Sequence, residues 1–355
     1  MQGEKKKGGF GKSALKILSS YSYVFVFIAL FFLYYLCNTS LTWTGVTNIL
    51  RHSAVIGIMS LGAGLVVITG DIDLSVGSIL AFASSVAVVI FNITDSVPLL
   101  LLTALGVGAL CGLINGLLVG KAKMPAFIVT LATMLILRSV VQYYCHILNE
   151  FYTGGGNNLY KLASTETKNA FFSFGNSKIL SLPMVGVVLI EVTIIIVYIT
   201  TSTKFGKKLY AVGSNVKAAR LAGVNTDGIT ITVFVLSGFL VGLAAFLWVA
   251  MNGAVDPSTT GKSNEMYAIV AVVLGGLSMS GGRGKFLGIL FGALSYTIID
   301  KIIASVNVDS LINDAIKGVI LIVAIVLQTT VPMMRAQRRS KSAAVSAKKS
   351  TGASA

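Results

Sequence analysis

Long apolar runs alternate with short polar stretches along most of the chain, and the length of these runs predicts its elements. A helix needs about 20 apolar residues to cross a hydrocarbon core of about 30 Å, and fewer where it is broken. The pattern predicts an all-α, polytopic membrane helix bundle with about ten transmembrane segments. The predicted segments are Ser20–Cys37, Ala54–Thr69, Ile79–Phe91, Val97–Gly120, Ala126–Ile147, Leu182–Thr200, Ile229–Met251, Met266–Met279, Phe286–Ile303 and Leu311–Val331.

Two of these segments, Ile79–Phe91 and Met266–Met279, are shorter than the others. Backbone that is not helical is tolerated inside a membrane only where protein or a water-filled cavity surrounds it. We therefore expect the two short segments to be half-helices that begin within the membrane, next to breaks in the bundle.

Composition and charge agree with a membrane protein and predict its orientation. The 355 residues are 55% hydrophobic and 12% charged, whereas a soluble domain is about one quarter charged. Lys and Arg of short loops stay on the cytoplasmic side, and most of the 28 basic residues fall there if both termini are cytoplasmic. The predicted organisation is a basic cytoplasmic tail at 1–18, a transmembrane domain at 19–331 with a cytoplasmic loop at 201–228, and a basic, disordered cytoplasmic tail at 332–355.

The net charge of +15 therefore reflects membrane topology, and we expect no nucleic-acid partner. The sequence also contains no nucleophilic triad, no phosphate-binding loop and no metal-ligand cluster. The stretch "TTGKSNE" at Thr259–Glu265 contains Gly-Lys-Ser but lacks the first glycine of a phosphate-binding loop, where Asp256 stands. We predict no catalytic residue, no metal and no cofactor, so that any ATP would be bound by another chain.

Glycines recur every fourth residue in several predicted segments. Such stripes let helix backbones approach closely in lipid, where burial of apolar surface supplies no driving force. We expect them to pack helices of this chain against each other rather than to form a dimer seam. The stripes are Gly108, Gly112, Gly116 and Gly120, then Gly238 and Gly242, and finally Gly284, Gly288 and Gly292.

Two ionisable residues lie deep in predicted spans, Arg138 in the fifth and Glu191 in the sixth. An unpaired charge at that depth costs at least a few kcal/mol. One hypothesis is a buried ion pair between Arg138 and Glu191 on adjacent helices. The alternative is that one of them reaches a water-filled cavity or snorkels toward the interface.

The predicted cytoplasmic loop contains a short helix. Ser214 or Asn215 can cap a helix over Val216–Ala222, and Gly223 can end it in a left-handed conformation. A helix of about two turns has little stability of its own in water, so it must lie against something. Either it rests on lipid headgroups or a cytoplasmic partner grips it.

Four stretches carry a resemblance to a known family. In order, they are "GDIDLSVGS", "GLINGLLVGKAKMPAFIVTLATMLILRS", "KFGKKLYAVGSNVKAARLAGVNT" and "LGGLSMSGGRGKFLGILFGAL". They resemble the permease subunits of bacterial ABC importers for ribose, galactose, xylose and related monosaccharides. The resemblance covers roughly Asn48 to Val331 and is highly specific for the family, but much less specific for the sugar.

The resemblance implies a non-enzymatic transport subunit of a bacterial cell membrane. Its implied partners are a second permease copy or a pseudo-dimeric equivalent, a cytoplasmic ATPase with two tandem nucleotide-binding domains that holds ATP–Mg, and an extracytoplasmic sugar-binding protein. It also implies that Gly213–Asn225 is the helix that couples the permease to the ATPase. The residues assigned to this coupling are Gly213, Asn215, Ala218, Arg220 and Gly223.

The same comparison matches Gly70, Asp73, Leu74 and Ser75 to a family motif that lies at the first predicted break. Asp73 precedes a helical run, so its carboxylate can accept hydrogen bonds from backbone N–H groups at the start of that helix. Polar groups at such a break can also bind sugar hydroxyls weakly. The predicted translocation path comprises Asp71, Asp73, Ser75 and Asn115.

Three other functions stay open at this point. The superfamily also contains permeases for nucleosides and branched-chain amino acids. An ion-coupled secondary transporter would bind its proton or sodium at Asp71, Glu191 or Asp300, and a receptor-like protein would transport nothing. A secondary transporter has no use for a helix that docks an ATPase. The loop at 148–181 contains no motif of the family.

Overall fold

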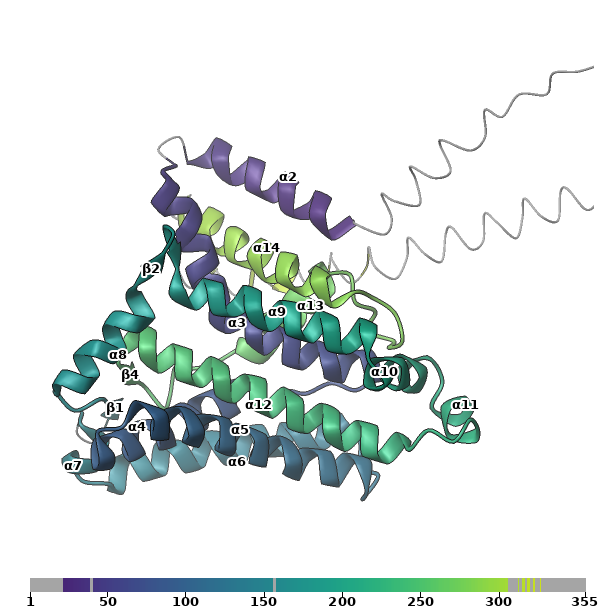
Figure 1. Cartoon of the computed structure of the whole chain (residues 1–355), viewed down its shortest axis with the longest axis horizontal. Coiled ribbons are helices and arrows are strands. Elements are labelled where there is room, and N and C mark those ends of the chain that lie inside the picture. Colours follow the sequence, from purple (N-terminus) through teal and green to yellow (C-terminus); the bar gives the residue numbers. More distant parts are fainter. Residues whose placement is uncertain are drawn as a thin grey trace, which may run out of the picture. The chain divides into compact units, whose positions relative to one another are not determined.

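The computed structural model describes residues 22–38, 41–155 and 158–305, and a few isolated positions beyond them. The described elements belong to the first of two compact units, Met1–Val306, and are almost all helical (Figure 1). The main helices are α2 (Ser22–Cys37), α3 (Trp43–Thr69), α4 (Val76–Thr94), α5 (Val97–Gly120), α6 (Ala126–Ile147), α9 (Met184–Ser202), α12 (Thr226–Asn252), α13 (Asn264–Leu274) and α14 (Phe286–Ser305).

Shorter elements connect these helices at the two ends of the bundle. The helices are α7 (Glu150–Thr153), α8 (Glu166–Asn176), α10 (Lys204–Ser214) and α11 (Val216–Leu221), and the strands are β1 (Tyr160–Lys161), β2 (Lys178–Ile179), β3 (Leu182–Pro183) and β4 (Ala254–Val255). The α7, α8 and β strands lie at one end, and α10 and α11 at the other (Figure 1).

The helices confirm a polytopic all-α membrane protein. The first nine predicted segments each overlap a helix, and seven of these helices are long and apolar enough to span a membrane. The third segment is longer than expected, because α4 begins already at Val76 and continues through polar Asn92 to Thr94. Its 19 residues are long enough to span a membrane, so the expected half-helix is wrong here. The eighth is short as predicted, with 11 residues in α13. The tenth predicted segment, at 311–331, and both tails fall almost entirely outside the described residues.

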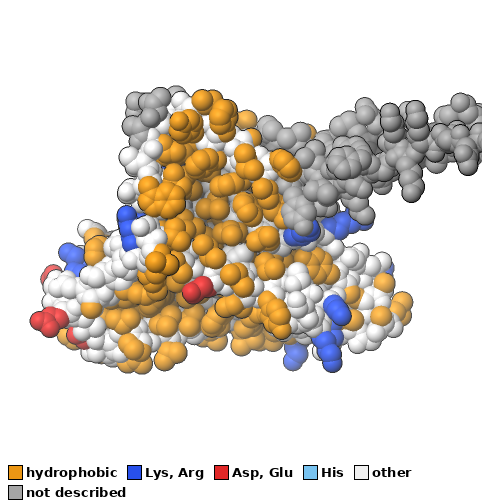
Figure 2. Space-filling model, turned by 45° about the horizontal axis from the view of Figure 1, so that its top comes forward, with side chains coloured by type: hydrophobic (Ala, Val, Ile, Leu, Met, Phe, Trp, Pro, Cys, Tyr) orange, Lys and Arg blue, Asp and Glu red, His pale blue; other side chains and the backbone are white. Residues whose placement is uncertain are grey.

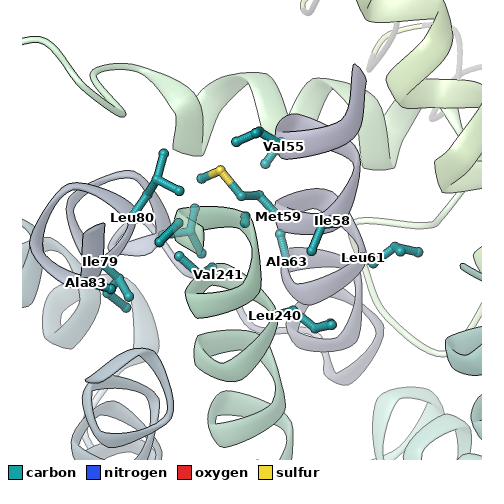
Figure 3. Close-up of a cluster of buried hydrophobic side chains, with 14 of the residues drawn as sticks. Val55, Ile58, Met59, Leu61, Ala63, Ile79, Leu80, Ala83, Leu240 and Val241 are labelled. Atoms are coloured by element: carbon teal, nitrogen blue, oxygen red, sulfur yellow. The ribbon is translucent and has the colours of Figure 1, made fainter. Parts of the chain in front are cut away.

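Helix α3 lies at the centre and is buried from Ser53 to its end at Thr69, apart from Ile56. Its apolar side chains pack with those of α4 and α12 in a continuous core (Figure 3). By contrast, α5, α6 and α9 expose many large apolar side chains. Figure 2 shows a broad apolar flank with charged side chains mainly toward its ends, as expected of a surface that faces lipid.

The predicted glycine stripes bring helices of this chain together. A Cβ on Gly108 would lie 2.2 Å from the carbonyl oxygen of Gly238, and one on Gly238 would lie 2.1 Å from that of Gly108. This places the stripes of α5 and α12 directly against each other. A Cβ on Gly292 would likewise meet the carbonyl oxygen of Ala271 at 1.9 Å, which joins α14 to α13. The prediction of close packing within the chain is confirmed.

The described residues of the loop at 148–181 connect two elements. Strand β1 pairs antiparallel with β4, with Tyr160 opposite Val255. Asn92 of α4 donates to the carbonyl oxygens of Tyr152 and Lys161 at 2.9 and 3.0 Å, and its Oδ1 accepts from the N–H of Ala163 at 2.8 Å. The loop therefore joins the far end of α4 to the segment that precedes α13.

Candidate functional site

Two helix breaks lie against each other inside the bundle. The first comprises residues 70–75, between α3 and α4, and the second residues 253–263, between α12 and α13. A Cβ on Gly77, at the start of α4, would lie 2.3 Å from the carbonyl oxygen of Gly261 and 2.4 Å from Oε2 of Glu265. The first turns of α4 and α13 are therefore packed together, which gives the bundle a polar region in its interior.

A hydrogen-bond network holds the first break in place. Oδ1 of Asp73 accepts from the backbone N–H of Ser75 at 2.8 Å and from its hydroxyl at 2.5 Å. Nδ2 of Asn115 on α5 donates to Oγ of Ser75 at 2.9 Å, and Oγ1 of Thr133 on α6 donates to Oδ1 of Asn115 at 2.7 Å. Asp73, Ser75 and Asn115 are all buried. Groups that satisfy one another in this way rigidify a buried site.

The predicted role of Asp73 at the start of a helix is confirmed with one shift. Helix α4 begins at Val76, with Ser75 in the capping position. The carboxylate therefore satisfies the N–H of the capping residue and shapes the turn that enters the helix, instead of bonding inside the first turn.

Two threonines of α6 belong to this site but were missed by the sequence reasoning. Oγ1 of Thr130 accepts from the backbone N–H of Leu74 at 3.1 Å, and Thr133 bonds Asn115 as described. A helical threonine usually bonds the carbonyl one turn back, as Thr130 also does to Ala126. Their spacing of three residues places them on one face of α6, and this is the only signal that could have indicated them.

Asp71 differs from the other three residues of the predicted path. It is half-buried, and its carboxylate accepts a long hydrogen bond of 3.4 Å from Oγ1 of Thr69. A carboxylate offers about four acceptor positions. Among the polar side chains of the first break, Asp71 therefore keeps the most capacity to bind something else.

The predicted ion pair between Arg138 and Glu191 is wrong. Nη1 of Arg138 donates to the backbone carbonyls of Pro257 and Thr260 at 3.1 and 2.6 Å, both in the second break. Glu191 is exposed on α9, which packs mainly against α3, α8, α10 and α14. Helix α6, which carries Arg138, packs mainly against α4 and α5 instead. Arg138 is instead the residue through which α6 holds the second break.

Replacing Arg138 by methionine should therefore destabilise the protein, because it leaves two carbonyl groups without their donor. Hydrogen bonds to a charged group contribute about 2 kcal/mol each, and Arg138→Lys should retain part of this. Glu191→Gln should change stability little. Thermal unfolding in detergent measures all three variants. A loss in Glu191→Gln equal to that in Arg138→Met would restore the ion-pair hypothesis.

The loop between α9 and α12 carries an exposed helix at its tip. Oδ1 of Asn215 accepts from the N–H of Ala218 at 3.0 Å and caps α11. Gly223 follows the helix with a φ of +80°. The predicted helix over Val216–Ala222 is thus confirmed to within one residue. Figure 1 shows α11 at the extreme of its end of the bundle.

Helix α11 presents apolar side chains to solvent. Leu221 is 91% exposed, Val216 is 45% exposed, and Ala218 is also exposed. Arg220 does not extend freely, because its guanidinium donates to Oγ1 of Thr226 and Oδ1 of Asp227, both at 3.0 Å. It braces α11 against the start of α12. Helix α11 therefore forms a small, partly apolar projection, which Arg220 holds against the start of α12.

The remaining predicted coupling residue, Gly213, lies elsewhere. It is the second-last residue of α10, and a Cβ there would lie 1.8 Å from the carbonyl oxygen of Ile68 in α3. Gly213 is therefore packed against the end of α3 instead of lying on the surface of the projection.

Comparison with known proteins shows which family the chain belongs to. A family model described as the permease component of the branched-chain amino acid transport system matches residues 45–325. No solved structure gives a significant match.

Curated relatives match most of the chain. The ribose import permease protein of Escherichia coli K12 is 36% identical over 284 residues, which is 79% of this chain and 84% of that one. The fructose import permease protein of Rhizobium meliloti is 34% identical, over 79% and 76% of the two chains. The autoinducer 2 import permease of Escherichia coli strain HS is 32% identical, over 79% and 78%. The family model covers more than half of the chain, and these relatives are more than 30% identical over most of it, so this chain belongs to the family of membrane permease components of bacterial solute transport systems.

Proposed function

We propose that the chain is the membrane permease subunit of an ABC importer, and that it forms the path for a monosaccharide of the ribose, galactose or xylose type. The observation that carries this proposal is the exposed helix α11, supported by Asn215 and Arg220 at one end of a bundle with a polar break inside. The relatives named for ribose and fructose import support the substrate class. The protein is a multi-pass protein of a bacterial inner membrane and a transport component rather than an enzyme.

Within this proposal, the partners are those that membership of the import-permease family implies. ATP–Mg is bound by a cytoplasmic ATPase with two tandem nucleotide-binding domains, which grips α11 through Ala218 and Leu221. A second permease copy completes the channel, and an extracytoplasmic binding protein delivers the sugar to the end that carries α7 and α8. Lipid covers the apolar flank.

We assign the contact with the solute to Asp71 and a supporting role to Asp73, Ser75 and Asn115. The latter three already satisfy one another, whereas Asp71 is half-buried with acceptor capacity left. A carboxylate can accept hydrogen bonds from sugar hydroxyls. Its binding must be weak, because a tight site would retain the solute during transport.

The description of the family model favours one alternative, a permease for branched-chain amino acids. Uptake in vesicles decides between the solutes. Vesicles that contain the permease, its ATPase and internal ATP, with the binding protein outside, should accumulate labelled ribose, galactose or xylose but not leucine. Uptake of leucine alone would favour the alternative. Uptake that continues without ATP and collapses with the proton gradient would replace the proposal by an ion-coupled transporter.

A further inference from the structure

The ends of α3 and α10 meet the loop before α14 in direct backbone contact. We call this contact the glycine junction, and it comprises Ile68, Gly70, Gly213, Gly281 and Gly282. The N–H of Gly282 donates to the carbonyl oxygen of Ile68 at 2.9 Å. A Cβ on Gly281 would lie 3.0 Å from both the carbonyl oxygen of Gly213 and the nitrogen of Gly70. Three segments that are far apart in the sequence therefore share one contact.

The glycine junction leaves no space for a side chain at Gly213 or Gly282. A Cβ on Gly213 would lie 1.8 Å from the carbonyl oxygen of Ile68 and 2.7 Å from the nitrogen of Gly282. Gly281 and Gly282 have φ values of +78° and +66°, which favour glycine. Contacts this close transmit displacement, because packed backbone has little room to give.

A tyrosine adds a second connection between the same segments. The hydroxyl of Tyr210 on α10 donates to the carbonyl oxygen of Gly284 at 2.9 Å. Burial raises the pKa of Tyr210, so the hydroxyl stays protonated and able to donate. Helix α10 is thus tied to the loop before α14 at two points, one turn apart.

The glycine junction lies between α11 and the first helix break. On one side, Gly213 is separated from the first residue of α11, Val216, by two residues. On the other side, Gly70 immediately precedes Asp71 in the first break. A second connection from α11 runs through Arg220 to Asp227 at the start of α12, and Asp227 also pairs with Lys123 in the loop before α6. Helix α12 is unbroken as far as Asn252. The shortest route from α11 to a helix break therefore passes through the glycine junction.

We infer that the glycine junction passes the movement of α11 to the break between α3 and α4, and that Gly213, Gly282 and Tyr210 are positioning residues for transport. The inference rests on the proposed function, in which an ATPase moves α11. The inference adds the place at which the movement of α11 reaches the transmembrane helices. If α10 moves as a rigid helix, it displaces the end of α3 and with it the position of Asp71. The hydrogen bonds among Asp73, Ser75 and Asn115 stay intact.

The variant Gly213→Ala tests the inference in the full complex with ATPase and binding protein. The ATPase should still co-purify and hydrolyse ATP, while sugar imported per ATP should fall about tenfold, because the added methyl group separates α10 from α3. Gly106→Ala is a matched control, since no atom lies within 4 Å of a Cβ there, and it should import normally. Unchanged import per ATP in Gly213→Ala would overturn the inference.

A second control separates transmission from ordinary loss of stability. A Cβ on Gly112 in α5 would lie 2.2 Å from the carbonyl oxygen of Phe234 in α12, and neither residue belongs to the glycine junction. Gly112→Ala should therefore lower stability, hydrolysis and import together, with import per ATP little changed. If Gly112→Ala reduced import per ATP as strongly as Gly213→Ala, the special role of the glycine junction would be refuted.

A milder variant and a direct readout cover the case in which Gly213→Ala fails to fold. Tyr210→Phe removes one hydroxyl and should reduce import per ATP while the complex stays assembled. With Cys37, Cys111 and Cys145 replaced by alanine, Ile72→Cys should react with a thiol reagent at a rate that changes on adding ATP. Tyr210→Phe should diminish this change. An undiminished change together with normal import per ATP in Tyr210→Phe would contradict the inference, whereas loss of the ATPase from the parent complex would contradict the proposed function itself.

Discussion

The variant Ala218→Arg should abolish ATP-dependent sugar uptake while leaving membrane insertion intact. Ala218 is exposed on α11, so the change does not disturb the packing of the permease itself. In the complex, a long charged side chain would have to enter a fitted groove of the ATPase. An unpaired charge in such a site costs several kcal/mol, and a loss of about 3 kcal/mol already weakens binding more than a hundredfold.

The measurements are co-purification of the ATPase and uptake in vesicles with internal ATP. Ala211→Arg is a matched control, because Ala211 is also an exposed alanine at this end of the molecule but lies on α10. It should retain most of the uptake. Normal uptake and normal co-purification in Ala218→Arg would show that α11 does not dock the ATPase.

The second large effect is expected at Asp73. Replacing this residue by alanine removes the acceptor for the N–H and the hydroxyl of Ser75, both of which are buried. A buried donor left without a partner costs about 1 to 3 kcal/mol, so Asp73→Ala should lose about 3 kcal/mol of stability or more. Asp73→Asn keeps a side-chain oxygen at the same place and should lose much less.

Thermal unfolding in detergent measures these losses of stability. Two further variants serve as controls. Ser85 is buried on α4 and its hydroxyl has no hydrogen-bond partner in the described structure, so Ser85→Ala should leave stability almost unchanged. Asp71→Ala should also leave the fold intact but reduce uptake. Equal losses in Asp73→Asn and Asp73→Ala would reject the role of the carboxylate oxygen, and full uptake by Asp71→Ala would remove Asp71 from the path.

Local features of this protein were predictable from the sequence. The spans follow from apolar length, because each must match the thickness of the bilayer. The helix α11 follows from Asn215 and Gly223, since a cap and a left-handed end act on residues only a few positions away. The glycine stripes predicted close packing, and the alternation of polar and apolar runs placed a break at Asp71 and Asp73.

The partners of these features were decided by the tertiary structure. Depth along a helix predicted the level of Arg138 but not the direction in which its side chain points, and its acceptors are backbone carbonyls of Pro257 and Thr260. Every residue carries such a carbonyl, so no sequence pattern distinguishes these two. The contact of Gly213 with Ile68 could not be predicted from the sequence either, because it also involves a backbone carbonyl oxygen. The sequence by itself determined nine of the apolar helices and the two breaks that precede α4 and α13, whereas backbone groups that are identical in every residue acquired their partners only when the helices packed.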